Sequence, residues 1–255
     1  MKLLVDMGNS SLKWATVSEG VLSETGLLTY DDLESQLTSQ WQLLAAPEAI
    51  MVSCVAHEQK WAIVSRCAQA LWNLIPRRIV SSGKEHGVVN AYRQPETLGS
   101  DRWMALVAAH ELYDRGVCVV DCGTALTIDL LNADGQHLGG VIVPGAHMMQ
   151  SSLHINTATL PESALNQSAI SNDQYWGQDT QSGIITGSWL AQAGAVQQVY
   201  QQYARQSDKP VCVLCGGGAS ILAGYVEKAI GRKPELEPDL VIKGLAVIVG
   251  ENIKS

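Results

Sequence analysis

A five-residue pattern occurs twice in this chain and limits its architecture more than any other feature of the sequence. Val5-Asp6-Met7-Gly8-Asn9 matches Val120-Asp121-Cys122-Gly123-Thr124, 115 residues further on. Apolar runs on both sides of each copy predict a strand, an Asp-x-Gly turn and a second strand. Two copies that open halves of similar length indicate two homologous domains. We therefore expect an α/β protein of two similar domains, residues 1–115 and 116–255, each a mixed β-sheet flanked by helices.

The segments after each copy fit this plan. Apolar residues at helical spacing predict helices over residues 58–75, 101–113, 182–205 and 240–253, while continuous apolar runs predict buried strands at 50–55 and 210–215. No charged or low-complexity linker separates the halves. We therefore expect them to pack closely, with a nucleotide cleft between them, because clefts between domains are preferred ligand sites.

Charge and cysteine content exclude several classes of protein. Seventeen basic and twenty-five acidic residues leave a net charge of −8, which argues against a nucleic-acid partner. The apolar run Met1–Val5 is too short for a signal peptide, and no uncharged apolar stretch reaches membrane-spanning length, so no membrane contact is expected. Six sparse cysteines indicate buried, reduced thiols rather than disulfides or a metal site, and hence a cytoplasmic protein.

The common catalytic motifs are absent from the sequence. There is no GxxxxGK[ST] and no GxGxxG after a strand, so P-loop enzymes and standard dinucleotide-binding folds are excluded. HExxH and GxSxG are also missing, and the six histidines show no metal-ligand spacing. Metalloprotease and esterase chemistry therefore has no support.

The first Asp-x-Gly turn has the parts of a phosphate site. Gly8 allows close approach of the backbone, and the amides of residues 9–11 can form an anion-binding concavity. Lys13 can reach phosphates as a point charge, and Asp6 can hold Mg²⁺ directly or through water. The candidate ATP-binding residues of this half are consecutive, Asp6-Met7-Gly8-Asn9-Ser10-Ser11-Leu12-Lys13.

The second copy offers the same parts, and a glycine-rich turn follows later. Asp121 and Thr124 match the first turn, and Gly216–Gly218 lies between a predicted strand and a helix, where a helix N-terminus favours phosphate. Either copy alone is more simply a hairpin turn with polar surface residues. The pair, together with Lys13 and the later glycines, favours a polyphosphate ligand.

Four motifs, taken in order along the chain, carry a family resemblance. They are Asp6-x-Gly8-Asn9-Ser10-x-x-Lys13, Gly99-Ser100-Asp101-Arg102, Asp121-x-Gly123-Thr124-Ala125-x-Thr127-x-Asp129 and Gly139-Gly140-x-Ile142-x-Pro144-Gly145. Thr159-Leu160-Pro161 matches loosely, and Thr180-x-x-Gly183-Ile184 and Gly216-Gly217-Gly218-Ala219 extend the match. The chain resembles the type III pantothenate kinases, within the wider superfamily of acetate kinase, sugar kinases, Hsp70 and actin.

The resemblance implies ATP-dependent phosphorylation of pantothenate at its primary hydroxyl, the first step towards coenzyme A. It also implies a homodimer and a monovalent cation, K⁺ or NH₄⁺, beside Mg²⁺-ATP. The 6–13 turn and Thr124 would then bind ATP, and Asp121 would hold the monovalent cation. The pantothenate-binding residues would be Tyr92, Gly99, Ser100, Asp101, Arg102 and Thr180, with Asp101 as the general base.

Each of these residues also has a simpler interpretation. Asp101 can act as an acid at a helix start, Arg102 as half of a surface ion pair, Tyr92 as loop packing and Asp129 as a brace for the second turn. Two other functions stay open: a kinase or phosphatase of the same superfamily with another substrate, and a nucleotide-binding regulatory protein without catalysis. Gly99–Arg102 argues against the first, and an intact Asp101 argues against the second.

Overall fold

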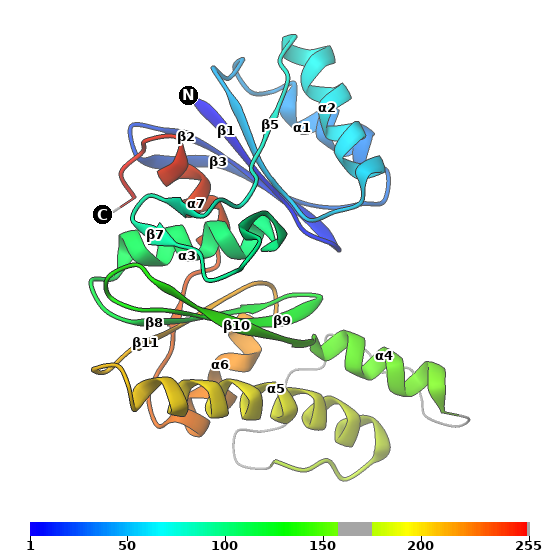
Figure 1. Cartoon of the computed structure of the whole chain (residues 1–255). Coiled ribbons are helices and arrows are strands. Elements are labelled where there is room, and N and C mark those ends of the chain that lie inside the picture. Colours follow the sequence, from blue (N-terminus) through cyan, green and yellow to red (C-terminus); the bar gives the residue numbers. More distant parts are fainter. Residues whose placement is uncertain (158–174, 254–255) are drawn as a thin grey trace. The chain divides into compact units, whose positions relative to one another are not determined.

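The computed structural model describes residues 1–157 and 175–253 and divides the chain into two compact units (Figure 1). Unit 1 comprises Met1–Asp114 and Leu240–Ser255, and unit 2 comprises Arg115–Asp239. Each unit is built on a five-stranded mixed sheet flanked by helices. The predicted α/β class is confirmed.

The sheet of unit 1 has the strand order β3-β2-β1-β4-β5. The strands are β1 (Lys2–Met7), β2 (Ser11–Ser18), β3 (Val21–Thr29), β4 (Ile50–Cys54) and β5 (Arg77–Arg78). The first three form an antiparallel meander, and β4 and β5 run parallel to β1. The predicted hairpin therefore continues into a third strand, whose largely exposed residues show no alternation of apolar and polar side chains.

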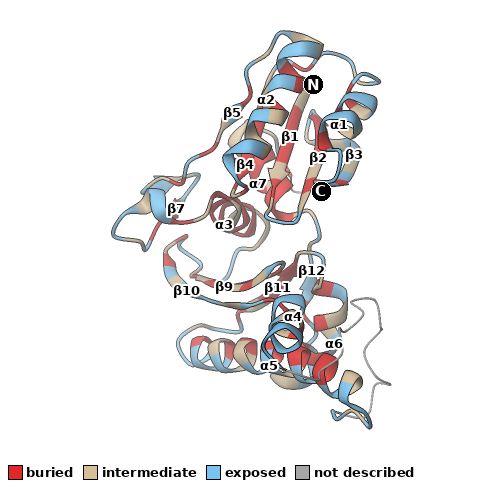
Figure 2. Cartoon of the chain, turned by 90° about the vertical axis from the view of Figure 1, so that its right-hand side faces the viewer, coloured by how far each residue is buried: buried red, intermediate tan, exposed pale blue. Residues whose placement is uncertain are grey.

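Helices cover both faces of this sheet. Leu3, Val5 and Met7 pack with residues of α1 (Leu33–Trp41) and α2 (Glu58–Trp72) on one face. The other face contacts α3 (Ser100–Leu112) and α7 (Leu240–Ile248), and Figure 2 shows the buried residues gathered between sheet and helices. The loop before α3 contains β6 (Lys84–Glu85), β7 (Val88–Val89) and a 3-10 helix at Pro95–Thr97.

The last helix belongs to unit 1, which differs from the predicted division that placed residues 240–255 in the second domain. Seven of its residues are buried, so it needs apolar partners on several sides. The helix packs against α3. Gly244 lies so close to α3 that a Cβ on it would come within 2.0 Å of the Met104 carbonyl oxygen. Lys2 also donates to the Val249 carbonyl and to Glu251. The order of elements along the chain does not show that α7 packs with the first unit rather than with the second.

Unit 2 repeats the topology of unit 1. Its strands are β8 (Val117–Cys122), β9 (Ala125–Leu131), β10 (His137–Pro144), β11 (Val211–Cys215) and β12 (Glu235–Leu236), in the order β10-β9-β8-β11-β12. The second Asp-x-Gly turn thus occupies the same place in its sheet as the first. The helices are α4 (Ala146–Asn156), α5 (Thr180–Ala204) and α6 (Ala219–Ile230). The repeat seen in the sequence is a repeat of structure.

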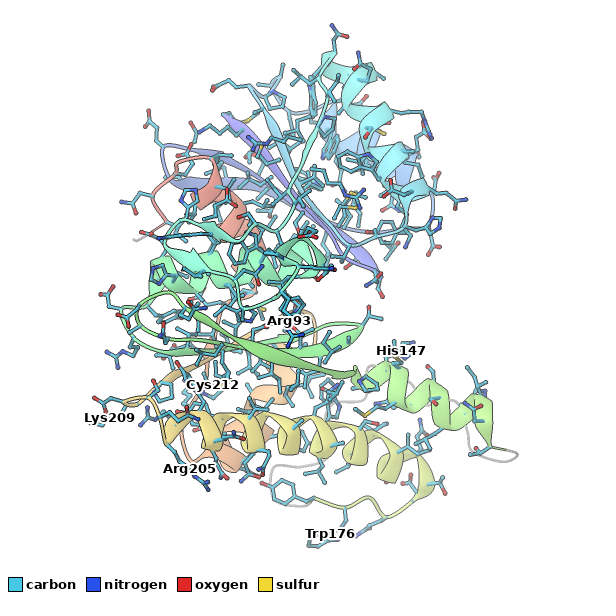
Figure 3. All side chains as sticks on the ribbon, viewed as in Figure 1. Arg93, His147, Trp176, Arg205, Lys209 and Cys212 are labelled. Carbon is cyan, nitrogen blue, oxygen red and sulfur yellow. The ribbon has the colours of Figure 1, made fainter. Side chains whose placement is uncertain are left out.

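All six cysteines are buried free thiols, as predicted. Cys118 and Cys212 are register partners on neighbouring strands, and both face the apolar core against α5 and α6. Figure 3 shows Cys212 between the sheet and α5. Burial raises the pKa of the Cys122 thiol, and the pKa of the Cys118 thiol is raised chiefly by its neighbour Cys212 and then by burial. Of the helices in residues 1–157 and 175–253, none is long and apolar enough to span a membrane.

Candidate active site

The first Asp-x-Gly turn lies at the carboxyl end of β1. Asp6 is the register partner of Lys13 on β2 and of Ser53 on β4. Residues directly opposite in a ladder point to the same face, so all three lie on one face of the sheet. Because their neighbours in sequence pack with α1 and α2, this is the face that α3 and α7 cover. Asp6 and Lys13 are thus oppositely charged residues in register on neighbouring strands, next to the turn.

The start of α3 is fixed to the same end of this sheet. The Ser100 hydroxyl accepts a hydrogen bond from the Cys54 amide at 3.0 Å and lies 3.1 Å from the Ser53 hydroxyl. Both serines are buried. Ser53 is also the strand partner of Asp6, so the structure brings the residue before Asp101 to the strand end that carries Asp6.

Asp101 is the second residue of α3 and is partly exposed. Its Oδ1 accepts the Arg102 amide at 2.8 Å, which holds the carboxylate against the helix start. Gly99 provides the room for this arrangement, because a Cβ there would lie 2.5 Å from the same oxygen. Asp101 therefore acts as a first-turn acid, as the simpler interpretation predicts, and keeps a partly exposed carboxylate.

Arg102 and Tyr92 form one pair within unit 1. Arg102 Nη1 donates to the Tyr92 hydroxyl at 2.9 Å, and the guanidinium carbon lies 5.7 Å from the centre of the ring. Arg102 is only 7% exposed, so it is not a surface ion pair. Asn90 Oδ1 accepts the Tyr92 amide, which orders the loop. Arg93, the next residue in sequence, is exposed and is labelled in Figure 3.

Two residues that the sequence did not single out contact the first turn from the α2 side. The Tyr30 hydroxyl lies 2.5 Å from the Gly8 carbonyl oxygen and 3.2 Å from that of Ser11. Lys60 Nζ donates to the Asn9 carbonyl at 2.9 Å and lies 3.5 Å from the centre of the Tyr30 ring. No motif contains these residues, since they are distant from the turn in sequence.

The second Asp-x-Gly turn, in unit 2, is surrounded by glycines. Asp121 is the register partner of Thr127 and Cys215. Gly216 has a φ of +83°, and a Cβ on it would lie 2.4 Å from Asp121 Oδ1. The Gly145 amide donates to the exposed Thr124 carbonyl at 3.0 Å, and the Gly218 amide donates to the Cys122 carbonyl at 3.0 Å. The glycine-rich motifs of the sequence therefore meet at one turn.

Asp129 is buried in the same sheet and has a specific partner. Its Oδ1 lies 2.9 Å from His137 Nε2, and the two residues are 2% and 1% exposed. They join β9 to β10 near the sheet edge. This hydrogen bond has a structural explanation within the sheet. The role of Asp129 in the second turn stays a prediction.

Thr180 opens α5 and lines an apolar cavity of about 710 Å³ in unit 2. The Asp179 side chain caps this helix by accepting the Ser182 amide at 2.8 Å. The small residues Gly183 and Gly187 leave the α5 side of the cavity open, and Met148 and Leu153 of α4 form the opposite wall.

The predicted site residues are divided between the two units. Unit 1 holds residues 6–13, Tyr92 and Gly99–Arg102, whereas unit 2 holds Asp121, Thr124 and Thr180. Thr159-Leu160-Pro161 lies outside the described residues. Within the described part of the chain, no three His, Cys, Asp or Glu side chains are grouped to hold a metal ion.

Comparison with solved structures shows the class of fold. A conserved putative Baf family transcriptional activator from Campylobacter jejuni is 19% identical, with a TM-score of 0.57 and 97% of both chains covered. An activator of 2-hydroxyisocaproyl-CoA dehydratase from Clostridium difficile, with bound ADPNP, is 9% identical, with a TM-score of 0.53, covering 97% of this chain and 93% of that one. The chain therefore shares the fold of these solved structures.

Comparison of sequences gives the family. The model of the type III pantothenate kinases matches residues 2–202. A type III pantothenate kinase of Halorhodospira halophila is 35% identical over 96% of both chains. One of Nitrosococcus oceani is 32% identical over 100% of this chain and 96% of its own. The chain belongs to the type III pantothenate kinase family.

Proposed function

We propose that this protein transfers the γ-phosphoryl group of ATP to the primary hydroxyl of pantothenate, giving 4'-phosphopantothenate for coenzyme A synthesis. Family membership over nearly the whole chain supports the reaction. One observation supports a location for the reaction: the hydrogen bond between the Ser53 and Ser100 hydroxyls. It fixes the start of α3, and with it the partly exposed Asp101 carboxylate, at the strand end that carries the proposed phosphate-binding turn. Phosphoryl transfer depends on such positioning more than on covalent chemistry.

Asp101 is the general base in this proposal. A carboxylate within hydrogen-bonding distance of the hydroxyl accepts its proton as the oxygen bonds to phosphorus. The Arg102 amide and the space left by Gly99 fix the orientation of this carboxylate before substrate arrives. A pre-oriented base needs little rearrangement in the transition state.

The substrate-binding residues are Tyr92, Gly99, Ser100, Asp101, Arg102 and Thr180. Arg102 supplies a buried positive charge suited to the pantothenate carboxylate or to a phosphate oxygen, since guanidinium binds both well. Tyr92 accepts one of its hydrogen bonds and so fixes its direction. Ser100 acts mainly by holding the helix start to β4.

ATP is bound by residues 6–13 and by Thr124. The amides of residues 9–11 bind phosphate oxygens, with Lys13 as a nearby cation. Mg²⁺ neutralises phosphate charge when bound with ATP, and Asp6 holds it directly or through water. One protein carboxylate suits this ion, which takes most of its other ligands from phosphates and water.

Asp121 holds the monovalent cation, K⁺ or NH₄⁺. The donor set fits such an ion, because a half-buried carboxylate stands beside a turn rich in backbone carbonyls and Gly216 leaves space along the carboxylate. The bound cation would supply positive charge near the nucleotide phosphates. The six buried free thiols support a cytoplasmic location, where thiols stay reduced.

The reaction is tested by a coupled assay of ADP release with ATP, Mg²⁺ and pantothenate, run in K⁺ and in Na⁺. We expect turnover only when pantothenate is present, and faster turnover in K⁺ or NH₄⁺ than in Na⁺. Mass spectrometry of the product should show one added phosphoryl group. ATP hydrolysis that is independent of pantothenate, or no turnover at all, would contradict the proposed substrate.

A homodimer is also part of this proposal. Described residues of α4 and α5 line the apolar cavity, and one of them, Met148, is 45% exposed. Ile142 of β10, in the same unit, is 60% exposed. A second copy of the chain is a suitable partner, because it carries the same apolar surface. In a contact with two-fold symmetry, the same patch of each copy packs against the other copy.

We expect the protein to have twice the 27.4 kDa mass of one chain in sedimentation equilibrium. Met148→Glu should shift it to the mass of a single chain, because each copy would then bury an unpaired charge. Ile75→Glu is the matched control, as Ile75 is 85% exposed on unit 1 and should not affect the mass. A wild-type protein with the mass of one chain would exclude the dimer.

A further inference from the structure

We propose that Tyr30 and Lys60 are positioning residues that set the direction of the peptide groups in the first Asp-x-Gly turn, so that its amides face the phosphates of ATP. This inference rests on the proposed function, which places ATP at residues 6–13. It concerns residues outside every motif of the sequence, and it gives each of them a separate hydrogen bond to the turn.

The two side chains approach the turn from the same side. Tyr30 follows β3, and Lys60 lies in the first turn of α2, whose helix packs on the same face of the sheet as α1. The Tyr30 hydroxyl donates to the Gly8 carbonyl at 2.5 Å. The Lys60 ammonium donates to the Asn9 carbonyl at 2.9 Å and lies 3.5 Å from the centre of the Tyr30 ring. Two successive carbonyls are thus held towards α2.

The positions of these two carbonyls also determine where the neighbouring N–H groups point. In a trans peptide, the carbonyl of one residue and the N–H of the next point in opposite directions. Holding the carbonyls of Gly8 and Asn9 towards α2 therefore directs the N–H groups of Asn9 and Ser10 away from it. The opposite face carries Asp6 and Lys13, the residues proposed to bind Mg²⁺ and phosphate.

The contacts are suited to fixing a turn that contains glycine. Gly8 allows its backbone many conformations, and fixing it in advance removes part of the entropy lost on ligand binding. Burial raises the pKa of the Tyr30 hydroxyl well above its usual range, with smaller effects of Cys54 and Asp6. Tyr30 therefore keeps its proton and stays a donor. Lys60 is a charged donor, and such hydrogen bonds are stronger than neutral ones.

The test compares Lys60→Met and Tyr30→Phe with the wild type by steady-state kinetics and by ATP titration in a calorimeter. Each variant removes a donor and keeps most of the side-chain volume. We expect the KM and Kd for ATP to rise about tenfold in Lys60→Met and about fivefold in Tyr30→Phe. The KM for pantothenate should stay within about twofold. Lys60→Arg, which retains a charged donor, should restore most of the ATP affinity.

Matched controls separate this effect from a general loss of stability. Lys2 also donates to a backbone carbonyl of unit 1, that of Val249 at 2.8 Å, and Tyr203 donates to the Leu131 carbonyl at 2.7 Å in unit 2. Lys2→Met and Tyr203→Phe should lower the melting temperature as much as the test variants do. Both should leave the KM for ATP unchanged.

The outcomes distinguish this inference from the proposed function. If the wild type binds ATP and phosphorylates pantothenate, but Lys60→Met and Tyr30→Phe bind ATP equally well, only the positioning role is overturned. An effect of Lys60→Met without any effect of Tyr30→Phe would also overturn the joint role. If the wild type neither binds ATP nor uses pantothenate, the proposed function itself fails.

Discussion

Replacing Asp101 by Asn should lower kcat about a thousandfold and leave the affinity for ATP unchanged. The amide keeps the size of the carboxylate but cannot accept the hydroxyl proton, and a positioned general base contributes about 10²–10⁴ to the rate. The Asn side-chain oxygen can still accept the Arg102 amide, so the start of α3 should keep its geometry. Measurements of kcat with pantothenate and of ATP binding by calorimetry test this.

Glu34→Gln provides the control for the simpler interpretation of Asp101. Glu34 is also an acid in the first turn of a helix of unit 1, and it pairs with the exposed Arg66. If Asp101 acted only on the helix start, both substitutions would have the same small effect on stability and none on kcat. A kcat of Asp101→Asn within about tenfold of the wild type would exclude Asp101 as the base.

Gly216→Ala should abolish most of the activity through the second turn. A Cβ at this position would come 2.4 Å from Asp121 Oδ1 and 2.8 Å from the backbone of Cys122. The carboxylate and the turn therefore have to shift, and a misplacement of about 1 Å can cost about 100-fold in rate. We expect kcat/KM for ATP to fall about 100-fold and the stimulation by K⁺ over Na⁺ to disappear.

Gly231→Ala is the control for the backbone conformation alone. Gly231 also has a positive φ, +69°, but a Cβ on it would meet nothing within 4 Å. Both variants carry the cost of a left-handed alanine, about 1–2 kcal/mol, and only Gly216→Ala adds the collision. Equal losses of activity in the two variants would contradict the role of Asp121 and its surrounding turn.

Much of the fold could be predicted because it repeats. Two Asp-x-Gly turns at a fixed offset predict two related sheets, and both have the same strand order. The edge strand β3 was missed because its residues are mostly exposed and its apolar residues do not alternate with polar ones, so burial gave it no sequence pattern. The packing of α7 on α3 was missed for another reason. The apolar sequence of a helix predicts that the helix is buried, but it does not identify the element against which the helix packs.

The site was predictable only where its residues form a local motif. Residues 6–13 and 99–102 are continuous in sequence, and their hydrogen-bonding and glycine requirements can be derived from residue types. The roles of their neighbours depend on long-range packing. Tyr30 and Lys60 reach the turn from separate elements, and Arg102 donates to Tyr92, which lies in the loop before α3. No spacing rule connects such residues.

The return of α7 to unit 1 has a consequence for the order of folding during synthesis. A chain is made from its N-terminus, so residues 1–114 leave the ribosome first. The face of α3 that packs on α7 then has no partner until all of unit 2 has been made, and the contacts of Lys2 with Val249 and Glu251 also have to wait. Unit 2 is continuous in sequence and can close earlier. The unit that begins the chain is therefore completed after the one that follows it, and a nascent chain cannot present a finished Asp101 site before its last helix is made.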